Sequence, residues 1–126
     1  MLVSLQKAIY QSLSQIAPVV EVKTKTQAFP FVEIGELQIL DNHTKTNSER
    51  YDVFVQIHVF TKSNSSLQSK QFNKEAMSKM KNLQLTGQFK IDFIALELNR
   101  TLKEQESDSN VFHNVQEYKI TIEEEF

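Results

Sequence analysis

Three histidines, His43, His58 and His113, are the side chains of this chain best suited to bind a metal ion or transfer a proton. None belongs to an H-x-x-x-H or H-E-x-x-H arrangement, in which helical spacing points two imidazoles at one zinc ion. The chain also has no cysteine to supply thiolate ligands. The sequence therefore predicts no zinc or iron site. We expect His58 to be half-covered on a strand, with a hydrogen bond to its ring.

Serine and threonine residues gather in two polar stretches, 44–48 and 61–66. A serine nucleophile needs an activating base and an oxyanion hole, which is commonly built on a tight glycine turn. The chain has only two glycines, Gly35 and Gly87, so it carries neither such a turn nor a phosphate-binding or dinucleotide-binding loop. We therefore predict no enzyme activity and no bound cofactor.

Acidic residues could supply acid–base or calcium chemistry at Glu33 and Glu36, or at Glu104, Glu106 and Asp108. A calcium loop needs oxygen ligands around a turn glycine, and the second group has no glycine. We expect both groups of carboxylates to be solvated rather than catalytic.

Lys70, Lys74 and Lys81, together with Lys79, form the one local basic patch that the sequence offers. The simplest interpretation is a solvated helix face. The alternative is contact with an acidic surface, such as the Glu123–Glu125 end of a neighbouring copy. Head-to-tail contact between unlike surfaces builds rings, and solvent-screened charges set orientation more than affinity.

The composition favours one ordinary globular domain over residues 1–126. The net charge of −2 and the pI near 5.9 provide no broad basic field, so we expect no nucleic-acid binding. Polar residues interrupt the apolar ones near the N-terminus, so no signal peptide is predicted, and no apolar run approaches the roughly 20 residues that cross a bilayer. We expect a soluble product of the cytoplasm that does not bind membranes.

Two segments have the apolar spacing of helices. The first runs from Leu2 to Ile16 and should stop at Ala17, because Pro18 lacks an N–H and restricts the residue before it. The second follows the sequence Ser65-Ser66-Leu67-Gln68, which fits a capping box, and should end before Gly87. Its predicted buried face consists of Phe72, Ala76, Met80 and Leu83.

Five segments have the alternation or composition of strands, and the clearest is Tyr51–Phe60, which is apolar on one face and partly aromatic on the other. The change of apolar phase at Gly35 predicts a β-bulge there. The other predicted strands are Val19–Thr24, Phe29–Leu40, Phe89–Leu98 with a kink, and Val111–Ile122. Polar connections at 41–50 and 99–110 join them as loops. These elements predict an α+β fold, a mainly antiparallel twisted sheet of four to five strands with two helices packed on it.

The order of these segments resembles the tail-completion proteins of long-tailed bacteriophages, also called tail terminator or tail-to-head joining proteins. The resemblance rests on the helix Met1–Tyr10, the strand Phe29–Glu36, Lys45-Thr46 in the next loop, and the strand Tyr51–Phe60. It implies a subunit of a ring, expected to be a hexamer, on the head-proximal end of the virion's tail tube. Such a ring stops tail polymerisation and joins the tail to the head connector. The implied partners are further copies of the chain, the tail tube protein and the head-completion or connector protein.

We predict that contacts with these partners come from the two polar loops, the lysine face and the acidic end of the chain, because loops on a rigid sheet commonly carry binding. The candidate contact residues are Asp41, His43, Lys45, Arg50, Lys70, Lys74, Lys81, Glu104, Glu106, Glu123, Glu124 and Glu125. Three alternatives stay open: a tail tube or minor tail subunit, a peptide-binding or ligand-binding module with an exposed sheet edge, and an enzyme of unfamiliar design.

Overall fold

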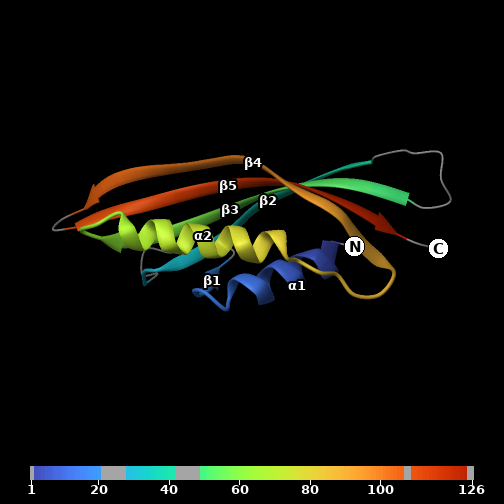
Figure 1. Ribbon diagram of the computed structural model, residues 1–126, viewed down its shortest axis with the longest axis horizontal. Helices are drawn as coiled ribbons and strands as arrows, with labels where there is room; N and C mark the ends of the chain where they lie inside the picture. Colours follow the sequence, from blue (N-terminus) through green and yellow to red (C-terminus); the bar gives the residue numbers. More distant parts are fainter. Residues whose placement is uncertain (1, 21–27, 42–48, 107–108, 125–126) are drawn as a thin grey trace.

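The computed structural model describes residues 2–20, 28–41, 49–106 and 109–124. They form one five-stranded sheet of order β1-β2-β3-β5-β4, with two helices on one side of it (Figure 1). All neighbouring strands are antiparallel except β1 and β2. The elements are α1 (Leu2–Leu13), β1 (Val19–Val20), β2 (Phe31–Asp41), β3 (Glu49–Ser63), α2 (Leu67–Lys81), β4 (Phe89–Glu106) and β5 (Ser109–Glu124). The predicted α+β class is confirmed.

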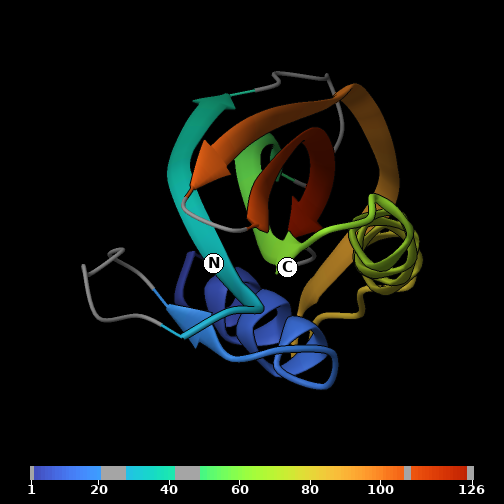
Figure 2. The same ribbon diagram turned by 90° about the vertical axis from the view of Figure 1, so that its left-hand side faces the viewer.

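The core lies between the helices and one face of the sheet. Alternate residues of β3 are buried on this face, and even-numbered residues of β5 join them because the two strands pair in register. The helices contribute Leu5, Ile9 and Leu13 from α1 and Ala76 and Met80 from α2. Seen along the long axis, the sheet is strongly twisted, with β2 and β4 on either side of β3 and β5 (Figure 2).

Both helices differ in detail from their predictions. α1 ends at Leu13 rather than Ile16, because the chain turns there: the amides of Ile16 and Ala17 both donate to the Leu13 carbonyl, at 3.0 and 3.3 Å. The predicted capping box is wrong. Ser66 makes no side-chain cap, and the hydroxyl of Ser65 instead accepts from the amide of Leu67, at 3.2 Å.

The predicted β-bulge at Gly35 is confirmed. Ile34 pairs with Ile57, but the next core residue of β2, Leu37, pairs with Val55, so Gly35 and Glu36 share the space of one residue. Glycine is needed for room: a Cβ here would lie 3.1 Å from the Nε2 of His58 and equally close to a side-chain carbon of β3. The predicted kink in β4 is also confirmed, as two register shifts, between Ile91 and Phe93 and between Leu96 and Leu98.

The predicted loop at 99–110 is wrong. β4 continues to Glu106, and β5 starts at Ser109, so the two strands form a long hairpin whose register runs from Asn99 opposite Gln116 to Glu106 opposite Ser109. The side chains of residues 99–105 are exposed, so this part of β4 has the polar sequence that is typical of a loop. Backbone pairing to β5, rather than burial, holds this part of β4.

Of the predicted strand Val19–Thr24, β1 confirms Val19 and Val20, and residues 21–24 lie outside the described residues. Most of the predicted connection 41–50 lies outside them too, although Asp41 ends β2 and Glu49 begins β3. None of the helices in the described ranges is long and apolar enough to cross a membrane.

Candidate interaction surface

The sheet has one face packed against helices and one that α1 and α2 leave uncovered, which we call the open face. It carries the even-numbered residues of β3, from Asp52 to Lys62, and the odd-numbered residues of β5 paired with them. Most of these side chains are half-buried rather than exposed. A sheet that is partly apolar on both faces is typical of one covered on both sides.

An aromatic cluster occupies the end of the open face near the start of β2. Phe31 stacks on Phe60 with ring centroids 4.7 Å apart, and Phe60 stacks on His113 at 4.2 Å. The Nδ1 of His58 lies 2.7 Å from the Nε2 of His113, so one imidazole donates and the other accepts. Burial lowers the pKa of His58 from its usual value, against the opposing effect of Glu33 and Glu117. The expectation that His58 is half-covered and hydrogen-bonded is confirmed.

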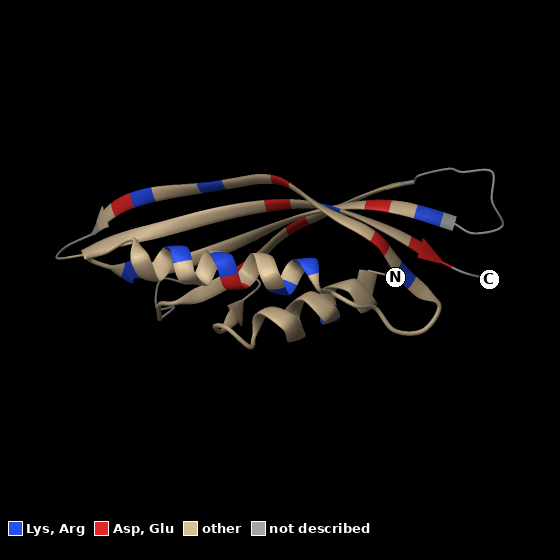
Figure 3. Cartoon of the chain, in the orientation of Figure 1, with Lys and Arg blue, Asp and Glu red and all other residues tan. Residues whose placement is uncertain are grey.

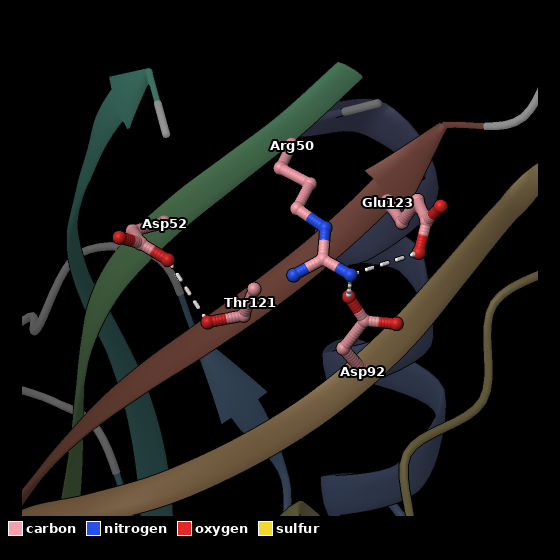
Figure 4. A network of polar contacts seen from close by, with 5 residues as sticks. All are labelled: Arg50, Asp52, Asp92, Thr121 and Glu123. Carbon is pink, nitrogen blue, oxygen red and sulfur yellow. Dashed lines mark hydrogen bonds and ion pairs between the residues drawn. The ribbon is translucent and has the colours of Figure 1, made fainter. Parts of the chain in front are cut away.

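Charged residues pair with one another at the other end of the open face (Figure 4). One guanidinium nitrogen of Arg50 lies 3.3 Å from a carboxylate oxygen of Asp92 and 3.6 Å from one of Glu123. Beside them, the hydroxyl of Thr121 donates to Asp52 at 2.9 Å. The carboxylate of Glu123 therefore already has a cationic partner within its own chain.

Between these two ends, the open face is hollowed into a shallow trough with a volume of about 350 Å³. We call it the acidic trough, because three carboxylates line it, each from a different strand: Glu36 of β2, Glu117 of β5 and Glu97 of β4. Gln38, Phe54 and Gln56 line it as well. The two exposed carboxylates, Glu36 and Glu97, both sit at β-bulges, where the extra residue re-aims the side chains.

Large apolar side chains are exposed along β4, the edge strand on this side of the sheet. Phe93 is 51% exposed, Leu98 40% and Leu102 37%. Leu98 and Leu102 pair with Glu117 and His113 of β5, which places both on the open face, Leu98 beside the trough and Leu102 beside the aromatic cluster. Apolar residues gathered around a concave surface are typical of a protein-binding site.

The opposite side of the molecule carries basic residues on α2 (Figure 3). Lys70, Lys74 and Lys81 are exposed and, at helical spacing, lie within about 40° of one another around the axis. We call them the lysine row. Lys79 does not belong to it, because its ammonium donates to the Oε1 of Gln15 at 2.6 Å and thereby links α2 to the segment after α1. The predicted basic face is thus narrower than expected.

A buried polar network that sequence reasoning missed holds α2 against the sheet. The Tyr118 hydroxyl donates to the Oε1 of Gln116, whose amide donates to the carbonyl of Asn73 on α2, at 3.1 Å, and to the Oδ1 of Asn114, at 2.9 Å. Burial raises the pKa of the Tyr118 phenol. The face of α2 toward the sheet is therefore partly polar, and includes Ser69 as well as the predicted Ala76 and Met80.

The other predicted contact residues are scattered. Glu104 is exposed on β4, and Glu124 accepts a hydrogen bond from Gln88 at 3.1 Å. Asp41 and Glu106 end β2 and β4, and their side chains lie outside the description, as do His43, Lys45 and Glu125 entirely. The structure thus brings Arg50 together with Glu123 but does not bring the lysine row near either. Within the described ranges, no three histidine, aspartate or glutamate side chains group as metal ligands.

Comparison with known proteins gives a family and a fold. Residues 7–123 match the family of tail completion protein gp17. A chain in the virion of a native gene transfer agent particle has the same fold, with a TM-score of 0.68 and 16% sequence identity, over 94% of this chain and 95% of that one. No curated protein matches. The chain therefore belongs to the tail completion protein gp17 family, and is a structural component of a bacteriophage-type tail.

Proposed function

We propose that residues 1–126 act as one tail-terminator unit, which forms a ring, expected to be a hexamer, on the head-proximal end of the tail tube. The ring stops polymerisation of the tube and offers its outer surface to the connector of the filled head. Assembly takes place in the host cytoplasm, and DNA passes through the ring without being bound by it. The partners are further copies of the chain, the tube protein and the connector protein.

The match to the tail completion family along nearly the whole chain carries this proposal. The surface of the molecule supports it. The open face holds half-buried aromatic and apolar side chains that neither helix covers, which suits a subunit that completes its packing in an assembly. The exposed edge strand β4 adds a further apolar border.

The test is to remove the gene from the particle that carries it and to examine the tails by electron microscopy. We expect tails of uncontrolled length that do not join heads, and supplying the chain in trans should restore both length and joining. A chain that caps purified tubes with one ring supports a terminator, whereas a chain that polymerises into long tubes is a tube subunit. Tails of normal length that join heads without the chain contradict the proposal.

A second variant asks which segment contacts the partners. Deleting residues 43–48 removes most of the connection between β2 and β3 and leaves Asn42, Glu49 and Arg50 to link Asp41 to its pairing partner Tyr51. A link of three residues is an ordinary hairpin length, so we expect a folded protein. It should fail to control tail length or to join heads. Normal virions from this deletion would exclude the segment from both contacts.

A further inference from the structure

We propose that, within the ring, the lysine row of α2 of one copy docks into the acidic trough of the next copy. This inference rests on the proposed function, because it assumes a ring, and it names the two surfaces that meet. The occupant of the open face is thus a second copy of the chain, and the contact is heterologous, with different surfaces on the two sides.

None of the described residues that line the acidic trough is cationic. Asp52, Asp92 and Glu123, which lie toward one end of that face, are neutralised by Lys119 and Arg50. Inside the trough, in contrast, the described residues provide no cationic partner.

Two of the trough carboxylates, Glu36 and Glu97, make no hydrogen bond or ion pair with the described part of the chain. The third, that of Glu117, accepts from the neutral amide of Gln56 at 2.6 Å. Like charges around one hollow repel one another, so an incoming cation lowers the energy of the site.

The lysine row has the complementary composition. Lys70, Lys74 and Lys81 make no ion pair with the described residues, whereas the neighbouring Lys79 is held by Gln15. Leu67, on the same side of α2 at helical spacing, is 63% exposed. The row therefore presents cations beside an apolar side chain, and the trough presents carboxylates beside Leu98, which pairs with Glu117.

The placement of the two surfaces fits a ring. The helices pack on one side of the sheet (Figure 1). The side chains of the trough belong mainly to the other face, so a contact between α2 and the trough joins unlike faces of successive copies. Such a contact closes into a ring when the rotation that relates one copy to the next, repeated a whole number of times, adds up to 360°. The leucines supply apolar contact area, and the charges set the orientation.

The structure also weighs against the acidic partner expected from the sequence. Glu123 is paired with Arg50, and Glu124 accepts from Gln88, so the described part of that acidic end is already occupied within the chain. In the acidic trough, the carboxylates of Glu36 and Glu97 have no such partner among the described residues.

Because the natural chain has no cysteine, disulfide crosslinking tests the contact without background. A Lys74→Cys variant is mixed with a Glu97→Cys variant that carries a size tag, so that a mixed disulfide reports contact between two copies only. The mixture is oxidised on purified tube ends and, separately, at high protein concentration in solution. We expect mixed disulfides at least tenfold above those of a control mixture with Lys7→Cys, an exposed lysine on α1. A mixed yield no greater than the control overturns the proposal, as does a dominant Glu97→Cys homodimer.

Charge reversal gives an independent readout. The triple variant Lys70→Glu, Lys74→Glu and Lys81→Glu should bind tube ends as a ring at least tenfold more weakly, with an unchanged melting temperature. Combining it with Glu36→Lys and Glu97→Lys should restore most of that loss, and no restoration contradicts the pairing. If the natural chain caps tubes but the crosslink is absent, the inference fails and the proposed function stands. If the crosslink forms in solution but the chain caps no tube, the proposed function fails and the contact stands.

Discussion

The buried contact between Tyr118 and Gln116, two residues of β5, permits a double-mutant measurement of the polar network that also reaches Asn73 of α2. Both side chains are fully buried, and the phenol hydroxyl donates to the amide oxygen. Tyr118→Phe leaves that oxygen buried without its donor, which should cost about 1 to 3 kcal/mol of unfolding free energy. Because burial raises the pKa of Tyr118, the phenol stays protonated at neutral pH and the comparison measures a hydroxyl, not a charge.

Gln116→Leu should cost more, about 3 to 4 kcal/mol, because it removes the acceptor of the phenol and the donor to both Asn114 and the Asn73 carbonyl at once. In the double variant, neither partner of the Tyr118 contact is left unpaired. Its loss of stability should therefore be smaller than the two single losses together, by about 1 to 2 kcal/mol.

Urea denaturation followed by circular dichroism measures these differences, and Tyr10→Phe is the matched control. Tyr10 lies on α1 and is 50% exposed, so the same chemical change should alter stability by less than about 0.5 kcal/mol. Losses that add within error, or a Tyr118→Phe variant as stable as the control, would refute the assigned network.

Three further results are expected from the open face. Gly35→Ala should destabilise the protein by about 1 to 2 kcal/mol in urea denaturation, since the new Cβ would lie 3.1 Å from Nε2 of His58; a stabilised variant would contradict this close approach. Since burial lowers the pKa of His58, the unfolded state binds more protons, so stability should fall as the pH drops below about 6.5; a His58→Gln variant that keeps the full pH dependence would contradict the assignment. Arg50→Gln should cost about 1 kcal/mol or less at low salt, because the guanidinium is partly exposed beside Asp92 and Glu123, and 1 M NaCl should shrink the difference.

Sequence patterns predicted the parts of this fold that alternation and phase can encode. The alternating apolar residues of β3 predicted its buried face, and the phase change at Gly35 predicted the bulge, because a bulge leaves a visible shift of parity. The hairpin half formed by residues 99–106 was missed because the side chains of residues 99–105 are exposed and the pairing is made by the backbone. The pattern of polar and apolar side chains does not indicate whether the backbone pairs in this way.

The surfaces were harder to predict than the elements. Lys70, Lys74 and Lys81 were identified as one basic face because helical spacing alone groups them. The acidic trough was not, because Glu36, Glu97 and Glu117 lie on three strands and meet only once the sheet is paired and twisted. A signal for the buried network was present, since Asn114 and Gln116 share the parity of Tyr118 and Ile120 in β5, which places amides on a core face.

The two bulges in β4 have a consequence for how this strand can change length during evolution. Ile91 faces the core, the next core residues are Ile94 and Leu96, and after the second bulge the core side passes to Asn99. The first extra residue moves the core side from odd-numbered to even-numbered residues, and the second returns it to odd-numbered ones. Losing one of them alone would turn every later side chain to the wrong face, whereas losing both would leave the outer half of the strand correctly oriented. Among relatives of this chain, single-residue insertions and deletions in β4 should therefore occur as compensating pairs.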